Sequence, residues 1–163
     1  MSKQNTIIDK LKRTIERKEL GVDGEVLPFV YADEDIQNIK LDTTQSPFCA
    51  AVPLASGTID SDTSQYSERV TIALFFGDAM AQPMNDYDAI ENERIIDDCK
   101  RRAFLWLASM HNSADMELKL VSVNGAQRAY LHLDGNFTGY ILNVTLDELE
   151  SVGICEWKSL QVK

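Results

Sequence analysis

The stretch ERVTIALFF, at residues 68–76, decides the fold. Every second residue is a large apolar one, and two of the three between them are apolar as well: Val70, Ile72, Leu74 and Phe76, against Thr71, Ala73 and Phe75. A period of two predicts a β-strand, and apolar side chains on both faces indicate that the strand lies inside a sheet.

A second apolar stretch, FCAAVPL at residues 48–54, precedes it and predicts a central strand that ends at Pro53. We expect these two strands to form an antiparallel pair. Between them lies ASGTIDSDTSQYS, residues 55–67, which is rich in Ser, Thr, Asp and Gly. This composition predicts a long exposed loop, and we expect residues 57–66 to be irregular in an isolated subunit.

The N-terminal part predicts one helix and one short strand. The helix begins at Asn5 or Thr6 and ends at Gly21, in the left-handed position that follows many helices, with an apolar stripe of Ile7, Ile8, Leu11 and Ile15. The strand EVLPFVY covers residues 25–31. Since Pro28 has no N–H to donate, this strand is expected at the edge of the sheet or interrupted.

The main helix is predicted from Asp86 or Asp88 to Met110, because apolar residues recur there every three or four positions: Ile96, Cys99, Ala103, Trp106, Leu107 and Met110. Strands are expected at residues 118–123, 128–133 and 140–146. Asn124-Gly125, a strong hairpin signal, is expected to join the first two.

The order of elements is therefore α-β-β-β-α-β-β-β in a single domain of 163 residues. This order predicts an α+β fold, an antiparallel or mixed sheet with two helices packed on one face. The core is expected at about residues 5–147. A C-terminal tail, residues 148–163, remains, and Trp157 suggests that it docks on something.

Charge and composition narrow the possible partners. Sixteen basic residues against 26 acidic ones give a net charge of −10, which disfavours sequence-specific binding of nucleic acid. No apolar run approaches the ~18 residues of a membrane span. Cys49, Cys99 and Cys155 are odd in number and far apart, so we expect reduced thiols and a cytoplasmic location.

Catalytic, cofactor-binding and metal-binding residues are not predicted. The acidic pairs, such as Asp60 and Asp62, do not have the spacing of a calcium loop, and are interpreted as solvated charges. His111, at the end of the main helix, is interpreted as an electrostatic complement to the helix C-terminus, and His132 is interpreted as a surface residue of a strand. No nucleophile or phosphate-loop motif is present, so the chain is not predicted to be an enzyme.

Four stretches together carry a resemblance to a known family: PFCAAVPLASG, RVTIALFFGD, IENERIIDDCKRRAFLWL and FTGYILNVTL. In pattern and order they resemble the phage and prophage tail-terminator, or minor tail protein, family over about residues 5–147. The resemblance implies a structural virion-assembly protein that forms a ring, commonly a hexamer, at the end of the tail tube. Its partners would be other copies of itself and other tail or head proteins, in the host cytoplasm and in the virion.

Two segments, residues 31–47 and 55–67, are long enough to reach a neighbouring subunit. The interface residues expected there are Asp33, Glu34, Asp35, Thr58, Ile59, Asp60, Asp62 and Tyr66. Two alternatives stay open, a small cytosolic adaptor that binds a partner protein and an enzyme whose site is made by oligomerisation.

The charge leads to a first prediction. The isolated protein should not retard duplex DNA in a gel at ~0.15 M salt, since no phosphate-neutralising patch is evident. The basic residues that do cluster lie on the first helix, interspersed with Glu16 and Glu19: Lys10, Lys12, Arg13, Arg17 and Lys18. Micromolar, salt-sensitive binding would contradict the prediction.

Overall fold

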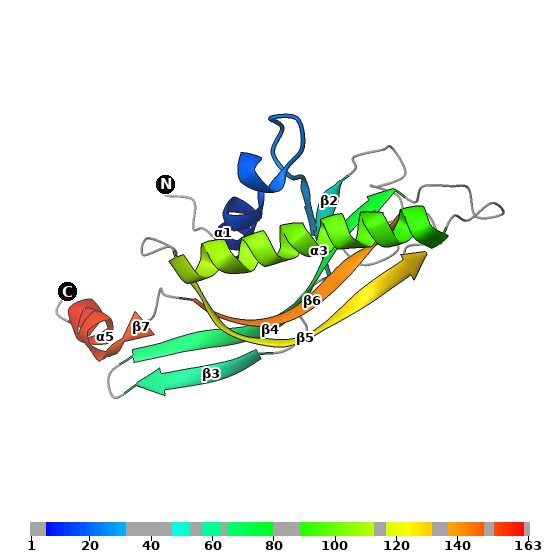
Figure 1. Ribbon diagram of the computed structural model, residues 1–163. Helices are drawn as coiled ribbons and strands as arrows, with labels where there is room; N and C mark the ends of the chain where they lie inside the picture. Colours follow the sequence, from blue (N-terminus) through cyan, green and yellow to red (C-terminus); the bar gives the residue numbers. More distant parts are fainter. Residues whose placement is uncertain are drawn as a thin grey trace.

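A computed structural model describes residues 6–31, 47–52, 57–62, 65–79, 89–112, 117–131, 137–148 and 152–161 (Figure 1). The helical elements are α1 (Ile7–Ile15), the 3-10 helix η1 (Lys18–Leu20), α3 (Ala89–Asn112) and α5 (Ile154–Gln161). The strands are β1 (Phe29–Tyr31), β2 (Phe48–Ala51), β3 (Gly57–Asp62), β4 (Gln65–Ala79), β5 (Leu118–Leu131), β6 (Phe137–Glu148) and β7 (Val152–Gly153). The predicted α+β class is confirmed.

Strand β4 is the centre of a single mixed sheet. The main path through the sheet is β1-β2-β4-β6-β5, and β3 and β7 pair with other parts of β4. The β1–β2 pair is parallel, whereas every other pair among the described strands is antiparallel. Figure 1 shows α1 and α3 on the same side of this sheet.

Strands β2 and β3 share one edge of β4. Leu74 pairs with Ala51 of β2, and Val70 pairs with Gly57 of β3. Both residues of β4 also pair with β6, so β6 must occupy the opposite edge. Only residues 63 and 64 separate β3 from β4, which makes the two strands a tight hairpin.

The core lies between the sheet and the helices, and Trp106 of α3 is at its centre. This side chain has no exposed surface, and its ring centroid lies 6.4 Å from that of Phe76 in β4. Its indole Nε1 donates a hydrogen bond of 3.0 Å to Thr14 Oγ1 of α1. The expected position of Trp106 between the main helix and the sheet is confirmed.

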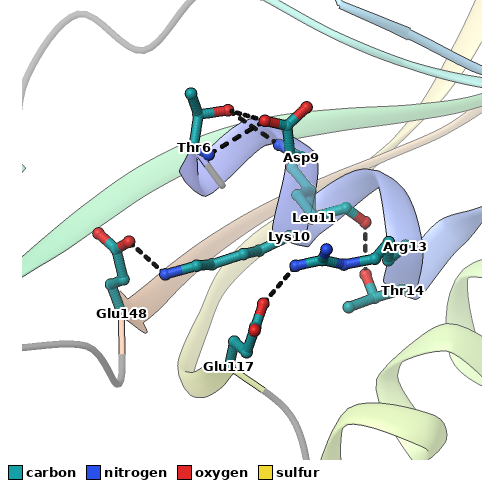
Figure 2. A network of polar contacts seen from close by, with 8 residues as sticks. All are labelled: Thr6, Asp9, Lys10, Leu11, Arg13, Thr14, Glu117 and Glu148. Carbon is teal, nitrogen blue, oxygen red and sulfur yellow. Dashed lines mark hydrogen bonds and ion pairs between the residues drawn. The ribbon is translucent and has the colours of Figure 1, made fainter. Parts of the chain in front are cut away.

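Helix α1 begins as its sequence predicts. Thr6 Oγ1 accepts a hydrogen bond from the Asp9 backbone, and the Asp9 carboxylate accepts one from the Thr6 backbone (Figure 2). Lys10, almost fully buried, then reaches Glu148 at the end of β6, with an Nζ–Oε1 distance of 2.6 Å. Arg13 pairs with Glu117 just before β5, so polar contacts anchor α1 at two places on the sheet.

A close approach of two strands explains a pair of glycines. Gly77 of β4 lies opposite Gly139 of β6. A Cβ atom on Gly139 would come within 2.1 Å of the Phe76 carbonyl oxygen, so no larger residue fits without movement of the backbone. The rings of Phe48 and Phe75 occupy the space beside Gly77 on the outer face of the sheet. They meet edge to face, with their centroids 5.6 Å apart.

The expected loop at residues 55–67 is wrong. Residues 57–62 form β3, and β4 begins at Gln65 rather than at residue 68. Six consecutive residue pairs, from Gly57–Val70 to Asp62–Gln65, join the two strands. The polar residues that suggested a loop instead form part of a two-stranded ribbon that extends beyond the main core. Thr58 and Ile59 of this ribbon are exposed.

The expected hairpin at Asn124-Gly125 is also wrong. Residues 118–131 form one continuous strand, β5, with irregularities between Leu120 and Ser122 and between Val123 and Gly125. Asn124 Nδ2 donates to Thr145 Oγ1 of β6 at 2.7 Å, which holds this residue beside the neighbouring strand. The Asn-Gly pair is therefore part of a β-bulge instead of a turn.

Two further details differ at the ends of the chain. Helix α1 ends at Ile15, and Gly21 is not left-handed, with a φ of −91°. A Cβ on Gly21 would lie 1.8 Å from the Glu25 carbonyl oxygen, so the close approach of the chain requires this glycine. In the tail, β7 pairs with β4, but Trp157 is 61% exposed and does not anchor it.

The packing around Trp106 leads to a second prediction. Trp106→Ala should lower the free energy of unfolding by ~3–5 kcal/mol, because it removes a fully buried side chain and the partner of Thr14 Oγ1. The matched control is Trp157→Ala, at an exposed position, which should change stability by no more than ~0.5 kcal/mol. Urea unfolding measures both, and equal midpoints for the two variants would contradict the assignment.

Candidate assembly interface

The β3–β4 hairpin carries the core-facing side of the sheet beyond the helices. Val70 is buried, whereas Tyr66, four residues earlier on the same face of β4, is 60% exposed. Ile59 pairs with Glu68 and therefore shares this face, and 76% of its surface is exposed. Two large apolar side chains thus stand uncovered on a sheet face that is buried farther along.

The base of this hairpin is fixed by polar contacts to β6. Ser67 Oγ donates to Asp147 Oδ1 at 3.1 Å, and Arg69 Nε lies 3.9 Å from Asp147 Oδ2. The Asp147 side chain is mostly buried, so its charge is poorly compensated by water and favours these partners. The hairpin consequently leaves the body of the sheet at a defined place.

Strand β7 and helix α5 lie at the same end of the molecule. β7 pairs with Gln65 and Tyr66, and Figure 1 shows α5 following it beside the end of the hairpin. Trp157 and Leu160, three residues apart on α5, are both exposed. This end of the chain therefore presents apolar side chains from two separate segments.

Two long strands form edges of the sheet. Among the described residues, β3 has β4 as its strand neighbour and β5 has β6. The outer side of each strand can therefore pair with a further chain. The third edge strand, β1, has only three residues, directly after Pro28, which makes it a much smaller target.

An uncharged polar row crosses the outer face of the sheet. Ser122 Oγ donates to Asn124 Oδ1 at 2.7 Å, and Asn124 Nδ2 donates to Thr145 Oγ1. The hydroxyls of Thr145 and Thr71 are 3.2 Å apart. These contacts tie β5, β6 and β4 together without using charge.

The far end of β5 is held against α3. Arg128 donates to the carboxylates of Glu93 and Asp97, and Tyr130 OH donates to Glu93 at 2.7 Å. The hydrogen bonds from Tyr130 and Arg128 lower the pKa of Glu93. The charge of Arg128 is thus matched within its own subunit.

A separate group of ionisable side chains lies where β4 approaches α3. Burial raises the pKa of Asp78, and it raises that of Cys99 to about 12. Arg102 Nη1 lies 3.9 Å from Cys99 Sγ. Burial likewise raises the pKa of Cys49, so both thiols remain protonated at neutral pH. Within the described ranges, no cluster of three or more His, Cys, Asp or Glu side chains could hold a metal ion.

The expected interface residues divide into three sets. Thr58, Ile59 and Tyr66 lie on the hairpin and are exposed. Asp60 and Asp62 belong to β3 through their backbone pairs. Asp33, Glu34 and Asp35 lie outside the described residues. β5 was not expected as a single edge strand; its 14 residues include two basic and no acidic ones.

Comparisons with known proteins add no relative: no family model matches the chain, and no curated protein matches it significantly. None of the described helices is long and apolar enough to cross a membrane.

The partly buried carboxyl of Asp78 leads to a third prediction. Because its pKa is raised in the native state, the native protein keeps this proton to a higher pH than the unfolded chain does. The free energy of unfolding should therefore fall as pH rises from the ordinary aspartate pKa, about 4, to the raised value, and then level off. Asp78→Asn should remove this fall.

Urea unfolding at a series of acidic pH values measures the effect. The lowered pKa values of Asp9 and Glu93 act in the opposite direction, so the informative quantity is the difference between the native protein and Asp78→Asn. Parallel stability curves for the two proteins would show that Asp78 does not titrate as stated.

Proposed function

We propose that this protein is a structural virion-assembly protein, a prophage tail terminator or head–tail completion component that forms a ring at the end of the tail tube. The observation that carries the proposal is the β3–β4 hairpin, which exposes Ile59 and Tyr66 on an otherwise buried sheet face. A ring of identical subunits needs two different surfaces that fit each other. The hairpin is one such surface, and a sheet edge of the next subunit is the other.

The sequence stretches PFCAAVPLASG, RVTIALFFGD, IENERIIDDCKRRAFLWL and FTGYILNVTL support the same proposal, because they resemble the tail-terminator family in pattern and order. Under this proposal the partners are other copies of the chain and other tail or head proteins, in the host cytoplasm and then in the virion. The net charge of −10 suits a protein past which DNA must slide without binding.

Self-association is the fourth prediction. Light scattering over a range of concentrations should show the native mass rising from one subunit to a fixed multiple. The double variant Ile59→Asp/Tyr66→Asp should need about tenfold or more higher concentration, since each exposed apolar side chain contributes ~1.5–3 kcal/mol when it becomes fully buried. The matched control is Ile90→Asp, at an exposed position on α3, which should assemble as the native protein does.

A second measurement links assembly to function. Added to growing tail tubes, the native protein should stop their elongation, and the hairpin variant should not. A protein that stays monomeric at every concentration and leaves tube length unchanged would refute the proposal. The adaptor alternative would then gain support if the monomer bound an unrelated protein.

A further inference from the structure

The sheet face at the end of the β3–β4 hairpin has room for one more helix. Val70 of β4 is buried in the main core, but Glu68 and Tyr66, which precede it on the same face, are exposed. The five residue steps from Val70 back to Gln65 span about 17 Å of strand. Since a helix with its side chains is about 10–12 Å wide, one helix can lie across this face.

Helix α5 carries apolar side chains that its own subunit does not cover. Trp157 and Leu160 lie three residues apart, on one side of the helix, and are 61% and 65% exposed. α5 begins directly after β7, which pairs with the edge of β4 at Gln65 and Tyr66. In this position, beside the end of the hairpin, α5 leaves Tyr66 exposed (Figure 1). Each copy thus presents an uncovered helix side and an uncovered sheet face.

The charges on these two surfaces are opposite. Glu68 lies on the uncovered sheet face, where it pairs across the strands with Ile59. Lys158, next to Trp157, is the charged residue among the described side chains of α5, at positions 157–161. Glu68 and Lys158 are both exposed, and neither makes an ion pair within the part of the chain that the structure describes. An acid on one surface and a base on the other make the two surfaces complementary.

We propose that α5 of a neighbouring copy docks across the apolar face of the β3–β4 hairpin. In this contact the apolar side of α5 covers Ile59 and Tyr66, and Lys158 reaches Glu68. The inference rests on the proposed self-assembly and adds a contact to it, because pairing at a sheet edge joins backbone groups and does not cover side chains on the sheet face. Each copy donates one α5 and accepts another, so it has the two different surfaces that a ring requires.

A second exposed apolar pair is a poorer site for α5. Phe104 and Leu105 lie on the outer side of α3, one helical turn after Lys100 and Arg101. Lys100 Nζ is 6.0 Å from the centre of the Phe104 ring. Lys158 would meet like charges there, whereas on the hairpin face it meets an acid. The hairpin face is therefore the favoured site.

A charge exchange gives the fifth prediction. Lys158→Glu should raise the concentration needed for assembly about threefold or more, because a repulsion replaces an attraction between exposed groups. Glu68→Lys should have a similar effect, and the two changes in one chain should restore assembly. Arg101→Glu, an equal change of charge at an exposed position on α3, is the control and should have no effect. Light scattering over a range of concentrations measures all four proteins.

Cysteines test the same contact by position. Two proteins, Ile59→Cys and Leu160→Cys, each also carrying Cys155→Ser, are mixed and mildly oxidised. A disulfide-linked heterodimer is expected in the mixture and no dimer in either protein alone. A third protein carries both new cysteines in one chain and is oxidised at high dilution. An internal disulfide in it would show that α5 covers its own hairpin, which would overturn the inference.

The outcomes separate the two proposals. If the variant Ile59→Asp/Tyr66→Asp fails to assemble while Lys158→Glu assembles normally and no heterodimer forms, then the hairpin functions in assembly but α5 does not cover it. A native protein that never self-associates overturns both proposals.

Discussion

The eleven residue pairs between β4 and β6 are the interaction on which the rest of the structure depends. They place the residues of both strands in register, so that one face packs against α1 and α3 and the other carries polar side chains in its middle. A strand of 15 residues is about 50 Å long, whereas a helix of 24 residues is about 36 Å long. α3 therefore cannot cover all of β4, and the uncovered part is the hairpin with β3.

Two adjacent carboxylates at the end of β6 connect this hairpin to the helices. Asp147 contacts Ser67 and Arg69 on the outer face, and Glu148 contacts the buried Lys10 of α1 on the other. Successive residues of a strand point to opposite faces, so a single strand end fixes both layers. The hairpin is thus held in place within its own subunit, which would lower the entropy cost of association with a partner.

The sequence predicted those parts of the fold in which a side-chain period reports burial. The alternation at residues 68–76 and the stripe that includes Trp106 identified β4 and α3, and burial confirms both. Prediction from the sequence failed for β3, because a two-stranded ribbon that is exposed on both faces has the same polar composition as a loop. It failed at Asn124-Gly125 because the same dipeptide suits a turn and a bulge, and the contact that decides between them, to Thr145, is distant in sequence. The exposure of Ile59 and Tyr66 could not be predicted from the sequence, because it depends on where the helices stop covering the sheet.

An assembly that grows by pairing of sheet edges also needs features that end its growth. β1 is short and follows a proline, and the two bulges interrupt β5, so long regular edges are rare among the described strands. Such features limit edge pairing to a few residues, and in an assembly the number of those residues would set how strongly one copy holds the next. Whether repetition closes a ring or extends a filament depends on the rotation between successive copies. A sheet joined edge to edge would inherit that rotation from its own twist, so the angle at one short junction would determine the number of subunits.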